Sequence, residues 1–136
     1  EFQVRHDVGV SARHFDPILD AMQAVIEDKT GTGRRAYTKG IETCGKTGTV
    51  QNRSRADHSV FMALAPRENP QIALSVYVEN AGAGGDWAAP MAGLLIEKYV
   101  GGEVPNTARE QRVMGATYPL DPDFVDVESD LTSAVP

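Results

Sequence analysis

Two apolar segments that follow each other closely constrain the fold more than any other feature of the chain. Residues 60–65 (VFMALA) form a continuous apolar run, which is typical of a strand buried on both faces. Residues 72–78 alternate between apolar and other side chains, which predicts a strand with one apolar face. The connection, residues 66–70 (PRENP), is short and rich in turn formers. Together these features predict an antiparallel hairpin.

A third strand and two helices are expected around this hairpin. Residues 41–50 contain several β-branched side chains and two glycines, which favours a strand. Apolar residues between positions 15 and 26 recur at the spacing of one helical face. A second helix is expected over residues 87–99, with Asp86 as its N-cap. Because the strands are consecutive and the helices lie outside them, we predict an α+β fold, a helix-flanked antiparallel sheet.

Length and charge narrow the functional classes. The chain has 136 residues, which is enough for one domain with a core. Its formal net charge is −6, so we expect no nucleic-acid partner. Five of the acidic residues lie beyond position 120, and without them the rest of the chain carries about −1. No run approaches the ~18 apolar residues of a membrane span. Residues 105–136 hold few large apolar side chains, and we expect a largely irregular acidic tail there.

One short stretch admits two incompatible interpretations. Residues 40–47 (GIETCGKT) match the G-x-x-x-x-G-K-[ST] pattern of a phosphate-binding loop. The tripeptide Lys46-Thr47-Gly48 is also the K-T-G motif of a strand that binds a β-lactam or an acyl-D-Ala-D-Ala peptide. A phosphate loop needs a buried strand before it and a helix after it. Since the basic segment 34–39 precedes the motif and poor helix formers follow it, the K-T-G interpretation is favoured.

In the K-T-G interpretation, the motif lies on an edge strand that lines a cleft. Gly45 and Gly48 would let a ligand backbone approach the strand closely. Lys46 would supply a positive charge for a substrate carboxylate and would bias nearby proton transfers. Thr47 and Thr49 would place two hydroxyls on one face, because strand side chains alternate. The backbone N–H of Thr49 could also donate to an oxyanion.

Four blocks carry a family resemblance: GTGRRAYTKGIETCGKTGTVQN, DHSVFMALAP, NPQIALSVYVENAGAGG and AAPMAGLLIEKYVGG. In this order they resemble the end of the transpeptidase domain of class B penicillin-binding proteins, and most closely the penicillin-binding protein 2 type. The resemblance covers residues ~10 to 104. It implies the C-terminal portion of the penicillin-binding protein/serine β-lactamase fold. It also implies a serine D,D-transpeptidase that cross-links peptidoglycan, is acylated by β-lactams and needs no metal or cofactor.

The resemblance further implies a site and a setting. Lys46 and Thr49 would be catalytic, and Lys46, Thr47, Gly48 and Thr49 would bind the substrate. The partners would be the stem peptide (acyl-D-Ala-D-Ala), β-lactam antibiotics and, for the full-length protein, the cell-elongation machinery. Full-length members work in the periplasm, anchored to the inner membrane by an N-terminal helix that this chain does not contain.

The family's other two motifs, S-x-x-K and S-x-N, do not occur in the chain. No lysine has a serine three residues before it, and no serine has an asparagine two residues after it. We therefore expect residues 1–104 to be a C-terminal fragment of the domain that lacks the nucleophilic serine and its lysine base and is inactive alone. A sheet edge left exposed in such a fragment would favour self-association.

Several alternatives stay open at this point. The chain could derive from a related β-lactamase or β-lactam sensor, or it could be a non-catalytic binding module. Cys44 could be a nucleophile, although no His or Asp lies near it in sequence, which favours a small buried strand residue. Arg34 and Arg35 could contact anionic groups or lie in a solvated loop. Trp87 could stack on a ligand or anchor the start of a helix.

Overall fold

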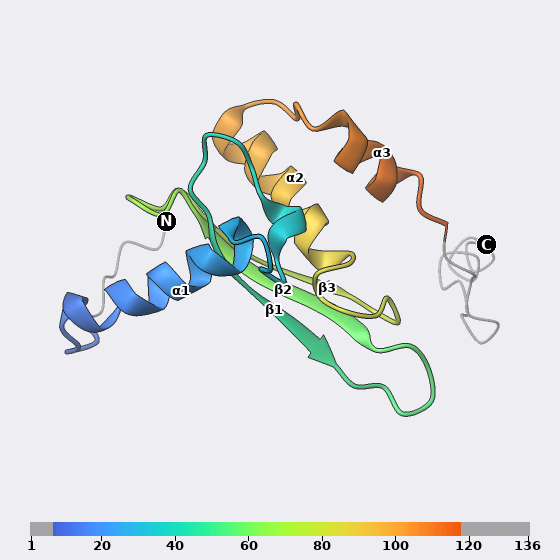
Figure 1. The fold of residues 1–136 in the computed structure, drawn as a ribbon, viewed down its shortest axis with the longest axis horizontal. Coiled ribbons are helices and arrows are strands. Elements are labelled where there is room, and N and C mark those ends of the chain that lie inside the picture. The colour runs from blue at the N-terminus through green and yellow to red at the C-terminus, as the bar shows by residue number, and fades with distance from the viewer. Residues whose placement is uncertain (1–6, 118–136) are drawn as a thin grey trace, which may run out of the picture.

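The computed structural model describes residues 7–117, which adopt an α+β fold around a three-stranded antiparallel sheet (Figure 1). The strands lie in the order β1-β2-β3 and are formed by Cys44–Val50, His58–Ala65 and Ile72–Val78. The helices are α1 (Asp16–Glu27), α2 (Ala88–Gly101) and α3 (Thr107–Met114), with short 3₁₀ turns at Ala12–His14 and Arg34–Ala36. None of the helices within residues 7–117 is long and apolar enough to cross a membrane. The predicted fold class is confirmed.

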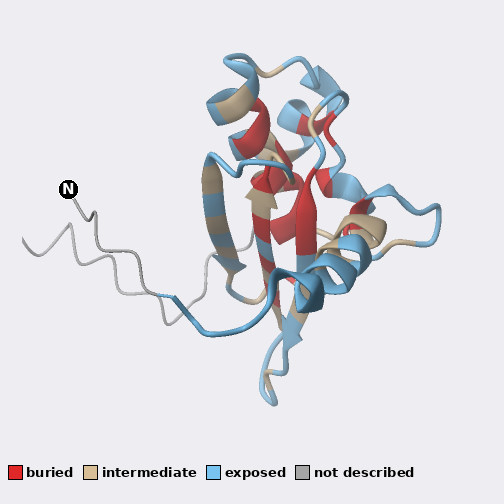
Figure 2. Ribbon diagram, turned by 90° about the vertical axis from the view of Figure 1, so that its left-hand side faces the viewer, coloured by how far each residue is buried: buried red, intermediate tan, exposed pale blue. Residues whose placement is uncertain are grey.

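The core lies between the sheet and α2. In the central strand β2, Phe61 pairs with Thr47 of β1 and with Val76 of β3, and its ring is fully buried. Burial of such a side chain stabilises a fold by about 1.5–3 kcal/mol. Ala92 and Ile96 of α2 are buried in the same cluster, and small residues on this helix allow it to approach the sheet closely. Figure 2 shows the buried residues gathered at the centre of the sheet and on neighbouring helical surfaces.

The prediction that residues 60–65 are buried on both faces is wrong. Alternate residues of β2 are buried, whereas Val60, Met62 and Leu64 point to the other face, where Met62 is 53% exposed. Helix α1 contacts β1, and the Cys44 thiol donates to the carbonyl of Leu19 at 3.5 Å. Cys44 is the register partner of Leu64, so α1 covers the β1 end of this second face, while Met62 at its centre stays exposed.

Helix α2 begins differently from the prediction. Asp86 is not its N-cap, because the helix starts at Ala88 and no side chain of the preceding residue caps it. Instead, the buried Ser59 hydroxyl of β2 accepts a hydrogen bond from the Ala88 N–H at 3.0 Å and donates to the carbonyl of Ala83 at 2.8 Å. A serine on the central strand thus ties down both the helix start and the loop before it, while Asp86 pairs with Arg35.

The prediction of irregular structure beyond residue 105 is wrong for Thr107–Met114, which forms α3. Asn106 caps this helix, since its side-chain oxygen accepts from the N–H of Arg109 at 3.0 Å. The guanidinium of Arg112 lies 4.8 Å from the ring centroid of Trp87, a cation–π contact that ties α3 to the start of α2. Residues 118–136 of the predicted tail lie outside the described residues, and the boundary at residue 104 stays a prediction.

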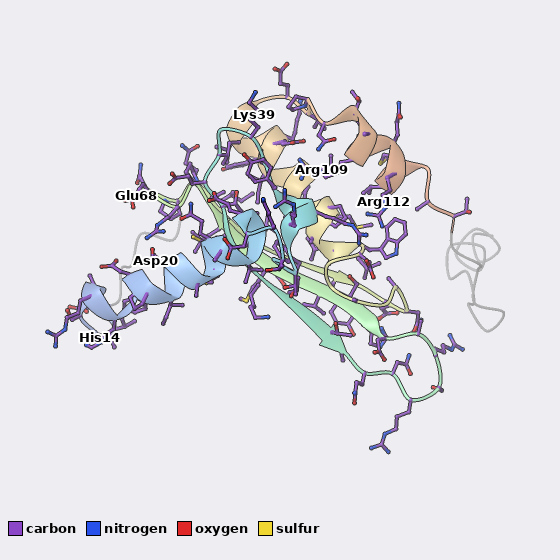
Figure 3. All side chains as sticks on the ribbon, in the orientation of Figure 1. His14, Asp20, Lys39, Glu68, Arg109 and Arg112 are labelled. Atoms are coloured by element: carbon purple, nitrogen blue, oxygen red, sulfur yellow. The ribbon has the colours of Figure 1, made fainter. Side chains whose placement is uncertain are left out.

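The buried Arg109 side chain anchors α3 to the rest of the fold (Figure 3). Its guanidinium pairs with the buried carboxylate of Glu97 on α2 and donates to the carbonyls of Arg35 and Tyr37 at 3.1 and 3.2 Å. Gly93 makes this possible, because a Cβ there would lie 2.0 Å from the Arg109 Nη1. Burial lowers the pKa of this guanidinium, while the Glu97 carboxylate acts in the opposite direction.

Candidate functional site

A cleft of about 630 Å³ opens beside the edge strand β1. Three segments form its walls: the loop that follows α1, β1 itself and the loop that precedes α2. Thr32, Arg35, Thr47, Thr49 and Asp86 are among the residues that line it. Within the described sheet, β1 pairs only with β2, so one long edge of β1 is free to meet a ligand.

Backbone-to-backbone contacts fix the shape of this cleft. Gly84 packs over the Gly48–Val60 pair so closely that a Cβ on Gly84 would lie 2.3 Å from the Val60 oxygen and 2.4 Å from the Gly48 oxygen. Likewise, a Cβ on Gly85 would lie 2.3 Å from the carbonyl oxygen of Thr32. Real Cβ atoms do not approach other atoms this closely, so any larger residue at either glycine would push the walls apart.

The same contact indicates which backbone groups of β1 point outward. A Cβ on Gly84 would lie within 2.4 Å of both the Gly48 and the Val60 carbonyl oxygens, so these two oxygens are close together. This is the arrangement of a hydrogen-bonded residue pair in an antiparallel ladder. Backbone groups alternate in direction along a strand, so those of Thr47 and Thr49 point to the free edge. The Lys46 ammonium donates to the Thr47 carbonyl at 2.8 Å, which agrees with this assignment.

The side chains of the K-T-G segment divide between two faces of the strand. Thr47 and Thr49 line the cleft, and the Thr47 hydroxyl lies 2.8 Å from the hydroxyl of Thr32. Lys46 and Gly48 do not line the cleft, because they alternate with the two threonines along β1. The exposed Lys46 side chain nevertheless brings its ammonium to the strand edge, at the carbonyl of the next residue. The structure thus brings together two hydroxyls, one ammonium and a free backbone edge.

The predicted role of Gly45 in ligand approach is wrong. A Cβ on Gly45 would lie 2.5 Å from the Phe61 ring and 3.0 Å from the Ile26 side chain, so this glycine makes room for the core. Gly48 differs, because a Cβ there would meet only Val60, at an ordinary 3.5 Å. Of the two glycines, only Gly48 has room for a Cβ, at ordinary contact distance from Val60.

The cleft carries excess positive charge. Arg34 and Arg35 line it, and Lys46 adds an ammonium at the strand edge, whereas Asp86 is the single acidic residue in the lining. Arg35 pairs with Asp86 and donates to the carbonyl of Gly85 at 3.3 Å, so it bridges two of the walls. Such a cleft favours an anionic ligand group over a cationic one.

Two residues that line the cleft were not predicted as site residues from the sequence. Thr32 and Asp86 belong to loops that are distant from the motif in sequence, and no motif marks them as ligand-binding. The sequence signal that could have indicated them is the presence of neighbouring glycines. Thr32 lies between Gly31 and Gly33, and Asp86 follows a Gly-Gly pair. Close backbone approach explains those glycines, since Gly31, Gly33 and Gly85 all lack room for a Cβ.

Cys44 lies outside the cleft and does not resemble a nucleophile. Its side chain is fully buried, and burial raises the pKa of the thiol, which keeps it protonated. These observations favour the interpretation of Cys44 as a small buried strand residue. In the part of the chain that the structure describes, no three His, Cys, Asp or Glu side chains are placed to hold a metal ion.

Sequence comparison identifies the class of protein. Residues 2–97 match the penicillin binding protein transpeptidase domain family, and the chain belongs to that family. It is 31% identical over 104 residues to the peptidoglycan D,D-transpeptidase MrdA of Haemophilus influenzae, in an alignment that covers 65% of this chain and 16% of that protein. It is 37% identical over 84 residues to MrdA of Acinetobacter baumannii, with 51% and 12% covered.

Solved structures agree with this assignment. The crystal structure of Pseudomonas aeruginosa PBP2 in complex with WCK 5153 is similar to this chain with a TM-score of 0.56 and 33% identity, over 68% of this chain and 21% of that one. The D,D-transpeptidase domain of a peptidoglycan glycosyltransferase from Eggerthella lenta gives a TM-score of 0.50 and 30% identity, over 61% and 19%. The chain thus spans only 12–16% of the length of the two curated relatives named above.

Proposed function

We propose that this chain forms the K-T-G part of a serine D,D-transpeptidase that cross-links peptidoglycan stem peptides and is acylated by β-lactams. One observation carries the proposal: Thr47 and Thr49 line a cationic cleft along the free edge of β1. The names of the relatives, which are peptidoglycan D,D-transpeptidases, support the same reaction.

The proposed roles follow from the geometry of the edge strand. The extended acyl-D-Ala-D-Ala end of a stem peptide adds to the free edge of β1 as a further strand. Thr49 donates its backbone N–H to the oxyanion that develops during acylation, and Gly48 leaves the adjoining strand surface free of a side chain. Lys46 and Thr47 attract and bind the terminal carboxylate. We assign catalytic roles to Lys46 and Thr49, and substrate binding to all four residues from Lys46 to Thr49.

The nucleophilic serine and its lysine base must come from outside these 136 residues, because the chain holds no S-x-x-K motif. In this proposal the complete enzyme works in the periplasm, anchored to the inner membrane by an N-terminal helix outside the present chain. Its partners are the stem peptide, β-lactam antibiotics and the cell-elongation machinery. The reaction as proposed uses no metal or cofactor.

Labelling with a fluorescent penicillin tests the proposal. We expect stable labelling of the full-length protein that contains this chain and none of the 136-residue chain alone, because only the former carries a nucleophile. Replacement of Lys46 by Ala in the full-length protein should reduce the labelling rate, since the ammonium would no longer attract the penicillin carboxylate.

A matched control is Lys98→Ala, which removes one ammonium from α2, outside the cleft lining. Its labelling rate should equal that of the unmodified protein. Absence of labelling in the full-length protein with Lys46 intact would refute the proposed function. Stable labelling of the short chain would instead refute the requirement for an external serine.

A further inference from the structure

Thr32, in the loop that follows α1, occupies a rigidly defined position beside the K-T-G strand. The N–H of Gly33 donates to the carbonyl of Val25 at 2.9 Å, which ties the loop to the last turns of α1. A Cβ on Gly31 would lie 2.3 Å from that same carbonyl oxygen, and one on Gly33 would lie 2.8 Å from the Phe61 ring. The two glycines therefore press the loop against helix and sheet, and Thr32 stands between them.

A third glycine holds Thr32 from the opposite wall of the cleft. Gly85 packs so closely on the carbonyl of Thr32 that a Cβ would lie 2.3 Å from its oxygen. Close to this contact, the Arg35–Asp86 ion pair also joins the segment that follows α1 to the loop that precedes α2. Thr32 is thus fixed through its backbone, although its side chain is exposed to the cleft.

The only hydrogen bond shown for the Thr47 hydroxyl within residues 7–117 is to Thr32. The two Oγ1 atoms lie 2.8 Å apart, and either can donate. When the Thr47 hydroxyl donates a hydrogen bond to an anion, the Thr32 hydroxyl can donate one to the Thr47 oxygen in turn. Hydrogen bonds arranged in such a chain polarise and strengthen one another, and bonds to an ionised acceptor are stronger than neutral ones.

We propose that Thr32 is a positioning residue that orients the Thr47 hydroxyl toward the carboxylate of the bound ligand. This inference rests on the proposed function and extends it to a residue outside the K-T-G motif. The role is carried by one hydroxyl group, so it differs from a role in packing. It predicts that loss of the Thr32 hydroxyl weakens recognition of the ligand carboxylate and leaves the chemistry at the acyl carbon unchanged.

Acylation rates of the full-length protein with benzylpenicillin and with its methyl ester provide the test, because the ester lacks the anionic carboxylate. The Thr32→Val variant keeps the shape of the side chain and removes only the hydrogen-bonding group. Loss of one such bond corresponds to a roughly five-fold change in rate. We therefore expect Thr32→Val to slow acylation by the acid about five-fold, with little change for the ester.

Three companion variants sharpen the test. Thr32→Ser retains the hydroxyl and should restore the rate with the acid. Thr30→Val makes the same substitution at an exposed position in the same loop, outside the cleft lining, and should change neither rate. In a Thr47→Val background, Thr32→Val should have little further effect, because the hydroxyl that it orients is already absent.

The outcomes separate this inference from the function on which it rests. If the unmodified protein reacts with benzylpenicillin and Thr32→Val slows acid and ester equally, or slows neither, then the positioning role is wrong and the proposed function stands. If the unmodified protein does not react at all, the proposed function and the inference both fail.

Discussion

At the scale of single residues, the two glycines of β1 have different physical roles. Gly45 has no room for a Cβ because the Phe61 ring occupies the space, whereas Gly48 meets only ordinary contact distances. The loss in free energy of unfolding on adding one methyl group should therefore differ sharply between the two positions, even though both glycines belong to the same motif region.

We predict that Gly45→Ala lowers the free energy of unfolding by about 1–3 kcal/mol, as is usual when a packed core is overfilled. Gly48→Ala is the matched control and should change it by no more than about 0.5 kcal/mol. Urea denaturation followed by circular dichroism measures both. Equal losses for the two variants would contradict the assignment of Gly45 to the core.

The sequence predicted that Thr47 and Thr49 share one face of a strand, but not which residues of other segments they contact. The alternation of a strand was sufficient to place Thr47 and Thr49 together. The contact of Thr47 with Thr32 depends on how a loop packs against the strand, and neither residue type nor spacing reveals it. Gly45 was misinterpreted for the same reason, since Phe61 reaches it from a neighbouring strand.

At the scale of secondary structure elements, α3 shows how a polar segment can dock onto a fold. Arg109 and Arg112 lie three residues apart and so share one face of the helix. One pairs with the buried Glu97 and the other stacks on Trp87, so both contacts join α3 to α2. The segment has few large apolar residues, and its contacts with α2 replace the apolar stripe that the sequence lacks.

We predict that Arg109→Ala lowers the free energy of unfolding by about 3–5 kcal/mol, because it leaves the buried Glu97 carboxylate without a counterion. Arg112→Ala should cost only about 0.5–1 kcal/mol, as expected for an exposed cation–π contact. Denaturant titrations measure both losses. Fluorescence of Trp87, the only tryptophan, reports on the docking of α3 to α2.

A double variant provides the control for this prediction. Arg109→Met combined with Glu97→Leu removes both charges and should recover most of the stability lost in Arg109→Ala. If Arg109→Ala is as stable as the unmodified chain, the ion pair does not anchor α3.

The order of the central elements was predictable, whereas α3 was not. The hairpin is encoded locally, through an apolar run, a turn-rich connection and an alternating run. The burial of Arg109 depends on the gap at Gly93 on another helix, and that gap is visible only in three dimensions. The one-sided burial of β2 was missed because an apolar run alone does not show which neighbours cover its second face.

At the scale of the whole molecule, the sheet has two open edges within the described residues. One edge of β1 borders the cleft, and β3 pairs only with β2. The face that carries Met62 is open over β2 and β3, where Met62 is 53% and Tyr77 is 52% exposed. A free edge beside exposed apolar side chains favours pairing between chains.

We predict that the isolated chain self-associates as its concentration rises, which sedimentation velocity can measure. Ser75→Lys places a charge on an exposed position of β3 and should weaken this association. Ser54→Lys, in the exposed loop between β1 and β2, adds the same charge away from that edge and should have little effect. A chain that stays monomeric at every concentration, or that responds equally to both variants, would contradict pairing through β3.

Under the proposed function, the close packing of Gly84 and Gly85 on the strand and loop opposite limits how the cleft can change under selection by β-lactams. A population that evolves to exclude a bulky inhibitor can most simply do so by enlarging side chains around its binding site. Here two of the cleft's own positions cannot be enlarged without displacing the walls, because carbonyl oxygens already occupy the space. Under the proposed function, substitutions that narrow the cleft are therefore expected at exposed lining positions outside the assigned catalytic residues, such as Ala83. Gly84 and Gly85 should be absent from such substitutions.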